Sequence, residues 1–593
     1  MKKYILLIAS LLMGASLTSA ETLSLGYTEG KNYTGAPMGI GAGDNMWIDI
    51  AIKIPGSTIR TLAGAQITGV NGSCSSTADV ETFHIWLRQD LEGENLAEFT
   101  LVPNQLNNVK KGINKLKFKT PWEIPADFEG DLYIGFGYKY SSGNARGLAV
   151  STNPIPGGFY MLRADSLWYD YSHLGSACIE AIVEGENLPK INPQLSRIDF
   201  PEFYIKTREE YTPTFVIHNF GTETLASIDV TAQFDGCEAI TQQVAVDTES
   251  GMMETFTLSF NPQDAPINAT NATFTIAPTT GEDADTENNS LAGTFTTAPL
   301  EYQHRVLSEE FTTEMCGSCP AITKWTHEEL QKEEFKDIIM VCHHAGYKTD
   351  FLTTAWDSEY TKLFGGGTFA PGFAADRAIL SQNDIVFFPT PNEALTDWWK
   401  VRLAEPALVS VDLKVTQSEN AENEIVVEVW GEKCIETIAE NPSVTVWLIE
   451  DGIPAVDQAN GGKDYVHNHV NRAVQSENYW GEPITFEGDK YNYSCTFTLD
   501  EGWVKENMYV VAFIGENGSN YMQHFVRNAN RVKLTDQIDA VERIEADKEV
   551  ISTEYFDITG QRVINPDKGI YIIRKSYSDG SVDTQKSIIR RNR

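Results

Sequence analysis

Most of the chain consists of short runs in which apolar and polar residues alternate, and this pattern constrains the fold more than any other feature. Met46–Ile52 and Leu132–Tyr138 are two such runs, and Gly, Asn and Asp residues separate each run from the next. Because successive side chains of a β-strand point to opposite faces of a sheet, the alternation predicts strands with one buried face. The sequence therefore predicts a multidomain, mainly β protein made of sandwich modules.

The length of 593 residues requires several domains, since one domain usually holds about 100–200 residues. The alternating pattern is interrupted once, and the interruption separates the β segments into two groups. We expect a β-sandwich at 21–189, an immunoglobulin-like domain at 190–299, an α/β domain at 300–406, a further β-sandwich at 407–536 and a small C-terminal β module at 541–593.

The interrupting segment alternates strands with helices. Arg305–Phe311 has the pattern of a strand, Pro320–Phe335 places apolar residues at helical spacing, and Ile338–His343 is a second apolar run. Two further helices are expected, at Trp356–Phe364 and Asn392–Leu403. Strand, helix and strand joined by short links predict a parallel or mixed α/β domain.

The N-terminus has the form of a secretory signal peptide, residues 1–20. Two lysines precede an apolar run from Tyr4 to Leu17, and the small residues Thr18–Ala20 follow. The run is shorter than the roughly 20 residues that span a bilayer, and no cysteine follows it to accept a lipid. We therefore expect an exported protein that begins at Glu21 and is not transmembrane.

The formal net charge of −37 excludes one class of partner. Such a chain repels phosphate backbones, so nucleic acid is not an expected partner. The sequence contains no phosphate-loop, calcium-hand, serine-hydrolase or zinc-protease motif. We expect no cofactor and no bound metal.

Export matters for the eight cysteines, because disulfides persist outside the cytoplasm. Cys74 and Cys178 are the only cysteines of the first expected sandwich, and Cys434 and Cys495 are those of the later one. We predict one disulfide within each of these pairs. Cys237 has no obvious partner.

Another pair, Cys316 and Cys319, follows a predicted strand and opens a predicted helix. Unpaired backbone N–H groups at a helix N-terminus stabilise a thiolate, which makes Cys316 the expected attacking sulfur. Cys319 lies one turn later and can attack a mixed disulfide, which makes it the resolving sulfur. The alternative is a short structural disulfide without turnover.

Histidines occur in pairs at two places. His343 and His344 follow Cys342 at the end of a predicted parallel strand, the edge where α/β folds bind ligands. Either imidazole could support a thiolate, and zinc binding together with the cysteine pair is less favoured than a hydrogen-bonded strand end. His467 and His469 would share one face of a strand, where we favour structural hydrogen bonding over metal binding.

Residues 300–406 resemble the thioredoxin superfamily. Glu310, six residues before Cys316, matches the buried acid that thioredoxins use for proton transfer, and Pro371 of TFAPGF matches their cis-proline. The resemblance implies a cis bond before Pro371, contact of Pro371 with the turn that holds Cys316 and Cys319, and a groove for an extended cysteine-containing peptide. The alternative for Glu310 is an ordinary acid on an edge strand.

Longer motifs resemble a Bacteroidetes family related to the twenty-eight-kilodalton outer-membrane protein. The motifs are EEFTTEMCGSCP, IIMVCHHAG, FAPGFAADR and YVHNHVNRAV, and the resemblance covers about residues 302–534. The segment VIHNFGTETLASIDVTAQFDG resembles bacterial surface spacer modules related to cell-adhesion domains. These resemblances imply a surface or outer-membrane protein.

The C-terminal tail resembles the sorting domains that the type IX secretion system recognises. The matching residues are Tyr555–Val563, Pro566 with Gly569, and Asp579 and Gly580 with Lys586. This resemblance implies association with the secretion system and display at the cell surface, with the periplasm as the alternative location.

Two functions follow from the sequence. The first is a thiol–disulfide oxidoreductase that acts on protein thiols or disulfides through Cys316 and Cys319, with Pro371 and Glu310 in its site. The second is a non-enzymatic surface binding protein or adhesin, in which the β modules contact surface ligands and the disulfide is structural. Exposed loops of β modules commonly carry binding function.

Overall fold

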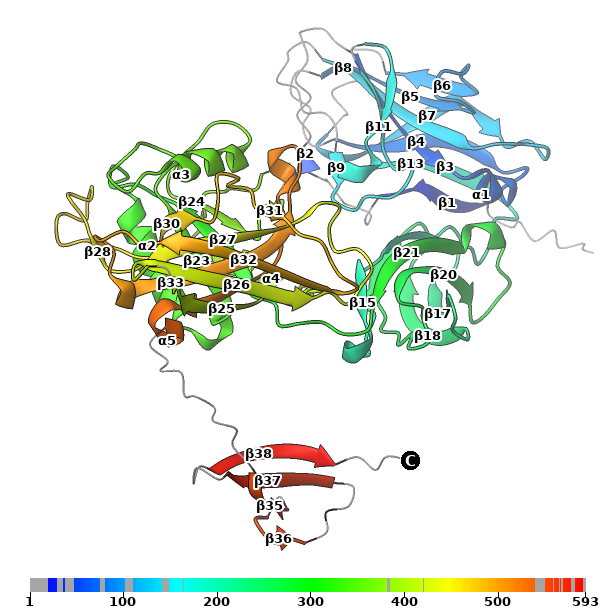
Figure 1. Ribbon diagram of the computed structural model, residues 1–593. Coiled ribbons are helices and arrows are strands. Elements are labelled where there is room, and N and C mark those ends of the chain that lie inside the picture. The colour runs from blue at the N-terminus through cyan, green and yellow to red at the C-terminus, as the bar shows by residue number, and fades with distance from the viewer. Residues whose placement is uncertain are drawn as a thin grey trace, which may run out of the picture. The chain divides into compact units, whose positions relative to one another are not determined.

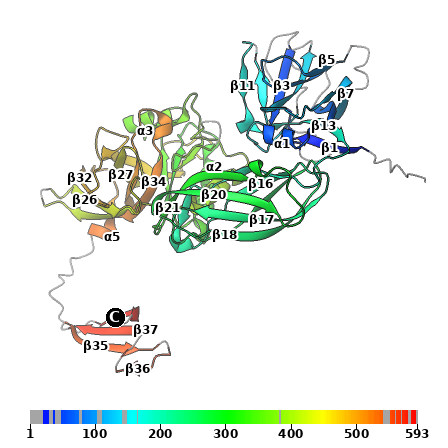
Figure 2. The ribbon, with the colours of Figure 1, turned by 90° about the vertical axis from the view of Figure 1, so that its right-hand side faces the viewer.

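The protein divides into two compact units, Met1–Glu301 and Tyr302–Arg593, which Figures 1 and 2 show in two views. The computed structural model describes residues 20–28, 36–37, 47–74, 80–101, 110–140, 149–163, 165–380, 384–419, 421–538, 550–557, 559–564, 566, 569–577 and 582–589. The expected signal peptide lies outside these ranges except for Ala20. Within the described part of the chain, no helix is long and apolar enough to cross a membrane.

The first half of unit 1 is a β-sandwich. One sheet has the order β1 (Glu21–Gly26), β13 (Ile179–Gly185), β4 (Gln66–Cys74) and β7 (Gly112–Glu123). Another has the order β11 (Trp168–Asp170), β10 (Tyr160–Leu162), β3 (Trp47–Ile54), β8 (Leu132–Tyr140), β5 (Val80–Arg88) and β6 (Ala97–Thr100). Helix α1 (Gly56–Arg60) and a short sheet of β12 (Ser176–Ala177), β9 (Ala149–Ser151) and β2 (Ala36–Pro37) accompany them. The expected alternation builds this core, since Ile48, Ile50, Ile52 and Ile54 are buried while Asp49 and Lys53 are only partly buried.

The second half of unit 1 is a smaller sandwich, seen as the green strands β16–β18 and β20 in Figure 2. Three strands have the order β14 (Pro193–Asp199), β16 (Thr214–Asn219) and β19 (Met253–Thr257). Five have the order β15 (Phe203–Ile205), β21 (Ser290–Ala298), β20 (Asn268–Pro278), β17 (Leu225–Phe234) and β18 (Ile240–Thr248). Aromatic rings fill the space between the sheets, with Phe234 and Phe274 edge to face at 5.6 Å.

Unit 2 is built around one mixed sheet. Its order is β24 (Gly372–Ala375), β22 (Val306–Phe311), β23 (Ile338–His343), β30 (Val470–Val474), β27 (Pro442–Glu450), β33 (Met508–Glu516) and β34 (Val526–Lys533), with β31 (Glu482–Pro483) beside β27. β22 and β23 are parallel, as expected, and β23 also pairs with β30 through Cys342 and Val470. Strands from both sides of the expected boundary between residues 406 and 407 therefore share one sheet.

The α/β half of this sheet is buried on both faces. One face carries Leu307 and Val341 in a cluster that continues to Trp447 in the β half. The opposite face carries Val306 and Met340 in a second cluster. Burial on both faces is typical of parallel strands.

Helices and a smaller sheet accompany the mixed sheet of unit 2. The helices are α2 (Cys319–Leu330), α3 (Ala355–Tyr360), α4 (Glu393–Ala404) and α5 (Leu534–Ile538), and the smaller sheet has the order β25 (Asp412–Gln417), β26 (Glu424–Glu432) and β32 (Lys490–Thr498). Helix α2 ends five residues before its expected limit, Phe335, which lies in a 3₁₀ turn, Glu333–Phe335. Thr354 and Asp357 form a capping box that begins α3.

Two predicted disulfides are wrong, because the structure keeps their sulfurs as thiols. The backbone N–H of Ser73 donates to the carbonyl of Cys178. Cys178 thus lies opposite Ser73, and neighbouring Cys74 faces the other side of the sheet. In the later pair, Cys495 lies opposite Val427 of β26, whereas Cys434 lies beyond the end of that strand at Glu432. Strand register, which the sequence does not give, separates both pairs.

The C-terminal module is a four-stranded antiparallel sheet. Its order is β36 (Arg562–Val563), β35 (Val550–Phe556), β37 (Gly569–Tyr577) and β38 (Val582–Ile589). The strands place most of the predicted sorting motif, including Lys586, in a β module as expected. Residues 541–549 and the motif residues Asp579 and Gly580 lie outside the described residues.

Candidate functional site

The cysteine pair lies between the end of β22 and the start of α2. Cys316 and Cys319 form a disulfide, and their Cα atoms are 5.5 Å apart. The two residues are only 3% and 1% exposed, although Gly317 and Ser318 between them are exposed. Both sulfurs therefore lie beneath the surface of a turn whose tip faces solvent.

The expected position of the first sulfur at a helix N-terminus is confirmed. α2 begins at Cys319, and the backbone N–H of Cys319 donates to Sγ of Cys316 at 3.2 Å. Sγ of Cys316 also lies 3.6 Å from Oγ of Ser318. A thiolate released at Cys316 would accept the first N–H of the helix, which lowers the free energy of its charged form.

Glu310 lies beneath α2 on a central strand, so the edge-strand alternative is wrong. β22 is flanked by β24 and β23, and Glu310 is 1% exposed. Its Oε1 accepts the hydroxyl of Thr323 at 2.9 Å, and Sγ of Cys342 donates to its Oε2 at 3.6 Å. Burial raises the pKa of Glu310. The carboxyl is thus suited to hold a proton, and its partner Thr323 lies one helical turn after Cys319.

Tyr465 extends this polar chain toward the surface. It hydrogen-bonds Thr323, and burial raises the pKa of its phenol to about 12. Tyr465 and Thr323 also line a groove of about 610 Å³ that runs along α2 from Pro320 past His327. Sequence reasoning missed Tyr465 and Thr323, although Tyr465 opens the quoted motif YVHNHVNRAV.

Pro371 stands directly before β24, the neighbour of β22. The expected cis bond between Ala370 and Pro371 is confirmed, and Thr390–Pro391 is a second cis bond. Gly372 pairs with Phe311, the last residue of β22. Pro371 therefore precedes β24 at the point where β22 ends and the chain continues to the cysteine pair. Contact between Pro371 and the cysteine pair stays a prediction.

A loop from the β half of the sheet closes over the cysteine pair. Nε2 of Gln458 donates to the carbonyl of Cys316 at 3.0 Å, and Nδ2 of Asn460 donates to the carbonyl of Gly317 at 2.8 Å. A third bond runs from the N–H of Ala459 to the carbonyl of Glu314 at 2.7 Å. These bonds hold the loop against the backbone of the cysteine turn, and sequence reasoning gave no sign of them.

The side-chain carboxylate of Glu314 also binds the same loop. Its Oε1 accepts the N–H of Val456 at 2.6 Å and lies 3.4 Å from Nε2 of His467. The ring of His467 packs against that of His344 at 4.8 Å. Burial, followed by the nearby His344, lowers the pKa of His467 to about 4. At neutral pH His467 is thus an uncharged hydrogen-bonding group.

His467 and His469 do not share a strand face, contrary to expectation. The strand β29 (Val466–His467) ends before His469, whose φ of +58° turns the chain. His469 donates its backbone N–H to Asp451 and packs its ring against His327. Among the described residues, no group of three or more His, Cys, Asp and Glu is placed to hold a metal ion. The favoured structural role fits these contacts.

His343 belongs to a buried charge network on the opposite face of β22. Its Nδ1 lies 2.9 Å from Asp357 and its Nε2 lies 3.2 Å from Glu309. Burial alone would lower the pKa of His343, but the bonds to both carboxylates outweigh burial and raise it. Arg377 completes the network with two hydrogen bonds to Glu309.

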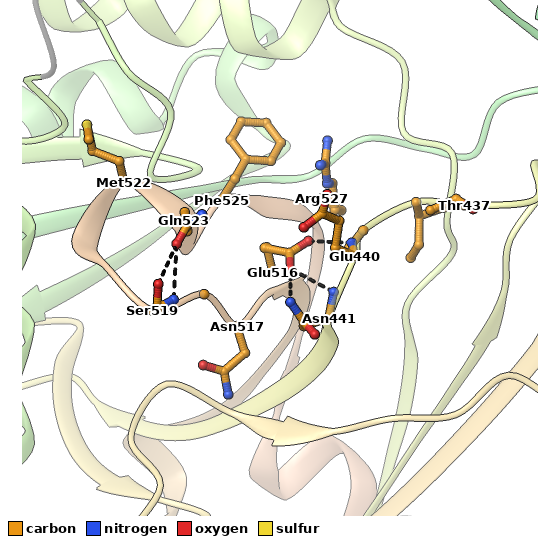
Figure 3. Close-up of a pocket in the computed structure, with 13 residues that line it drawn as sticks. Thr437, Glu440, Asn441, Glu516, Asn517, Ser519, Met522, Gln523, Phe525 and Arg527 are labelled. Atoms are coloured by element: carbon orange, nitrogen blue, oxygen red, sulfur yellow. Dashed lines mark hydrogen bonds between the residues drawn. The ribbon is translucent and has the colours of Figure 1, made fainter.

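A polar pocket of about 910 Å³ is lined by residues 437–441, which precede β27, and by residues between the end of β33 and β34 (Figure 3). Glu516 accepts the backbone N–H groups of Glu440 and Asn441, each at 2.7 Å. Oε1 of Gln523 accepts two bonds from Ser519. The polar groups drawn in Figure 3 thus bond largely to one another, and none of the expected site residues lines this pocket.

A match to a known protein family covers α4 and the β half of unit 2. Residues 390–537, about a quarter of the chain, match the family described as outer membrane protein Omp28. No curated protein matches the chain. Among solved structures, HBP35 of Porphyromonas gingivalis is 21% identical, with 49% of this chain and 99% of that one covered and a TM-score of 0.35. A domain of the outer membrane lipoprotein Omp28 from Porphyromonas gingivalis is 21% identical, with 22% and 88% covered and a TM-score of 0.16.

Proposed function

We propose that this protein is an exported thiol–disulfide oxidoreductase of the outer membrane or cell surface, and that residues 300–406 are its thioredoxin-like part. The observation that carries the proposal is the bond from the first N–H of α2 to Sγ of Cys316. The pair has a site for a thiolate, and Glu310, a buried acid with a raised pKa, bonds to Thr323 one helical turn after Cys319. Perturbed acids beside a reactive pair are typical of catalytic sites.

In the oxidised form, the pair accepts two electrons from a substrate dithiol. A substrate thiolate bonds to Sγ of Cys316 as the S–S bond breaks, and Cys319 leaves as a thiolate. A second substrate thiolate attacks the mixed disulfide and releases Cys316, so the substrate leaves as a disulfide. Glu310 donates its proton to the thiolate of Cys319 and takes up the proton of one substrate thiol, and the proton of the other substrate thiol ends on Cys316, so both substrate protons end on the cysteine pair and Glu310 returns to its starting form.

The location rests on the match of residues 390–537 to an outer membrane family. The shared sheet supports extending it to the cysteine pair, because β23 and β30 join the two halves of unit 2. The predicted signal peptide and sorting module fit export, and the strongly acidic surface suits a protein outside the cytoplasm.

The test is dithiol-dependent reduction of insulin by purified protein. We expect turnover by the wild type and none by Cys316→Ser, since in this assay the dithiol reduces the pair and the thiolate of Cys316 then attacks the insulin disulfide. Cys237→Ser is the matched control, because it makes the same substitution at a cysteine outside the disulfide, in unit 1. Equal activity of wild type and Cys316→Ser would refute the oxidoreductase.

The burial of both sulfurs favours a second candidate, a surface binding protein with a structural disulfide. Cys316 and Cys319 are 3% and 1% exposed, and a folded substrate cannot approach a sulfur so covered. In this case the β modules would contact the ligand. The insulin assay separates the two functions, because a structural disulfide gives no turnover.

A further inference from the structure

The loop over the cysteine pair is held at its tip and at its base by separate contacts. We call residues 451–469, which connect β27 to β30, the covering segment. Its base is a short ladder of β28 (Ile453–Pro454) with β29, closed by a bond from the N–H of Gly452 to Oδ1 of Asn468 at 3.0 Å. The tip is a turn in which the N–H of Gly462 donates to the carbonyl of Gln458. The bonds between the tip and the cysteine turn are thus distinct from those that form the base.

The bonds from the tip go to backbone carbonyls of the cysteine turn. Gln458 and Ala459 donate to the carbonyls of Cys316 and Glu314, and Asn460 to that of Gly317. A carbonyl accepts equally well from the backbone N–H of an extended peptide. The covering segment thus uses the acceptors that a bound peptide would need.

The fit at the tip is close. A Cβ atom added at Gly317 would lie 2.9 Å from Nδ2 of Asn460. Gln458 is 2% exposed, and its Nε2 also lies within 3.4 Å of the carbonyl of Thr313. The tip therefore packs closely against the backbone of the cysteine turn, and Cys316 in that turn is only 3% exposed.

We propose that the covering segment is an internal occupant of the peptide site and that Gln458 is the positioning residue that fastens it. The proposal rests on the proposed function and names its regulation and substrate class. A substrate is an extended, cysteine-containing polypeptide that displaces the tip and donates N–H groups to the carbonyls of Glu314 and Cys316. Folded proteins that cannot supply such a strand are excluded. Once the tip is displaced, the substrate thiolate bonds to Sγ of Cys316 and Cys319 leaves as a thiolate.

The test measures how fast dithiothreitol reduces the disulfide of the full chain, read as alkylated mass over time. The double variant Gln458→Ala with Asn460→Ala should be reduced about tenfold faster, equivalent to ~1.4 kcal/mol, because the hydrogen bonds that close the tip are lost. Gln417→Ala is the matched control. Nε2 of Gln417 also donates to three carbonyls, those of Ala421, Glu422 and Glu424, in a turn outside the covering segment.

The outcomes separate this proposal from the oxidoreductase itself. Equal reduction rates in wild type and double variant would refute the proposal that the covering segment occupies the peptide site. An equal rise in the rate of Gln417→Ala would also refute it, because the faster reduction would then come from a general loss of stability. Thermal unfolding of the double variant should match that of the wild type. Insulin turnover is scored separately, so absence of turnover refutes the proposed function while the reduction rates still decide whether the segment covers the pair.

Discussion

Arg377→Met should destabilise unit 2 by about 3–5 kcal/mol, because it leaves Glu309 buried without its countercharge. Arg377 donates to Glu309 from Nε at 2.8 Å and from a terminal nitrogen at 2.9 Å, and neither side chain is more than 1% exposed. Burial alone would raise the pKa of Glu309, but Arg377 first and then His343 hold it at about 2, against an ordinary 4.5. That gap corresponds to ~3 kcal/mol, which agrees with the expected loss.

The difference between the folded and ordinary pKa of Glu309 also determines how the stability of unit 2 depends on pH. Because the pKa of folded Glu309 lies below its unfolded value, the stabilisation is fully present above about pH 4.5 and is lost as the pH falls toward 2. Arg377→Met should therefore lose less stability than the wild type across this interval.

The assay is hydrogen exchange of the full chain, followed by mass spectrometry of peptides from β27 and β33, which reports the free energy of opening in unit 2. Peptides from β17 and β20 in unit 1 should not change. Arg60→Met is the control for charge loss alone, since the Arg60–Glu287 pair is exposed and should contribute no more than about 1 kcal/mol. A change below about 1 kcal/mol in Arg377→Met would refute the reasoning, because the cost of an uncompensated buried charge would then be absent.

Three further predictions concern other parts of the molecule. Glu310→Gln should slow insulin reduction about 100-fold while the disulfide still forms by alkylated mass, since the variant keeps the shape but loses the proton; an unchanged rate would exclude Glu310 as the proton donor. Non-reducing peptide mapping should recover Cys316 linked to Cys319 and no other cystine, and recovery of any second linked pair would contradict the strand registers. Gly135→Ala should destabilise unit 1 by about 1–3 kcal/mol in urea, because the added Cβ would lie 1.8 Å from the ring of Trp86; a neutral result would mean that this ring moves freely.

Local pattern was sufficient to predict strands of unit 1 and much of the cysteine site in unit 2. The alternation in Met46–Ile52 and Leu132–Tyr138 predicted β3 and β8, and helical spacing after Cys319 predicted α2. The position of Cys316 before that helix predicted its bond to the first N–H. These features depend on residues close together in the chain, which is why the sequence is informative about them.

What the sequence could not give depends on register and on distant pairing. Gln458 contacts Cys316 across 142 residues, and the pairing of Cys342 with Val470 joins two segments that differ in local pattern. The rejected Cys74–Cys178 disulfide fails by a single position along a strand, which reverses the direction of a side chain. Neither a long-range contact nor a one-residue offset leaves a periodic signal in composition or spacing.

The sheet that continues across residues 406 and 407 also limits how this protein can be divided, by evolution or by protein engineering. A fragment that ends at residue 406 would carry the cysteine pair but lose β30 from the edge of β23, together with the tip that shields both sulfurs. Its counterpart would expose the edge of β30. Unpaired edges of this kind promote aggregation, so the segment that holds the cysteine pair cannot be exchanged between proteins as an independent domain without its β partner.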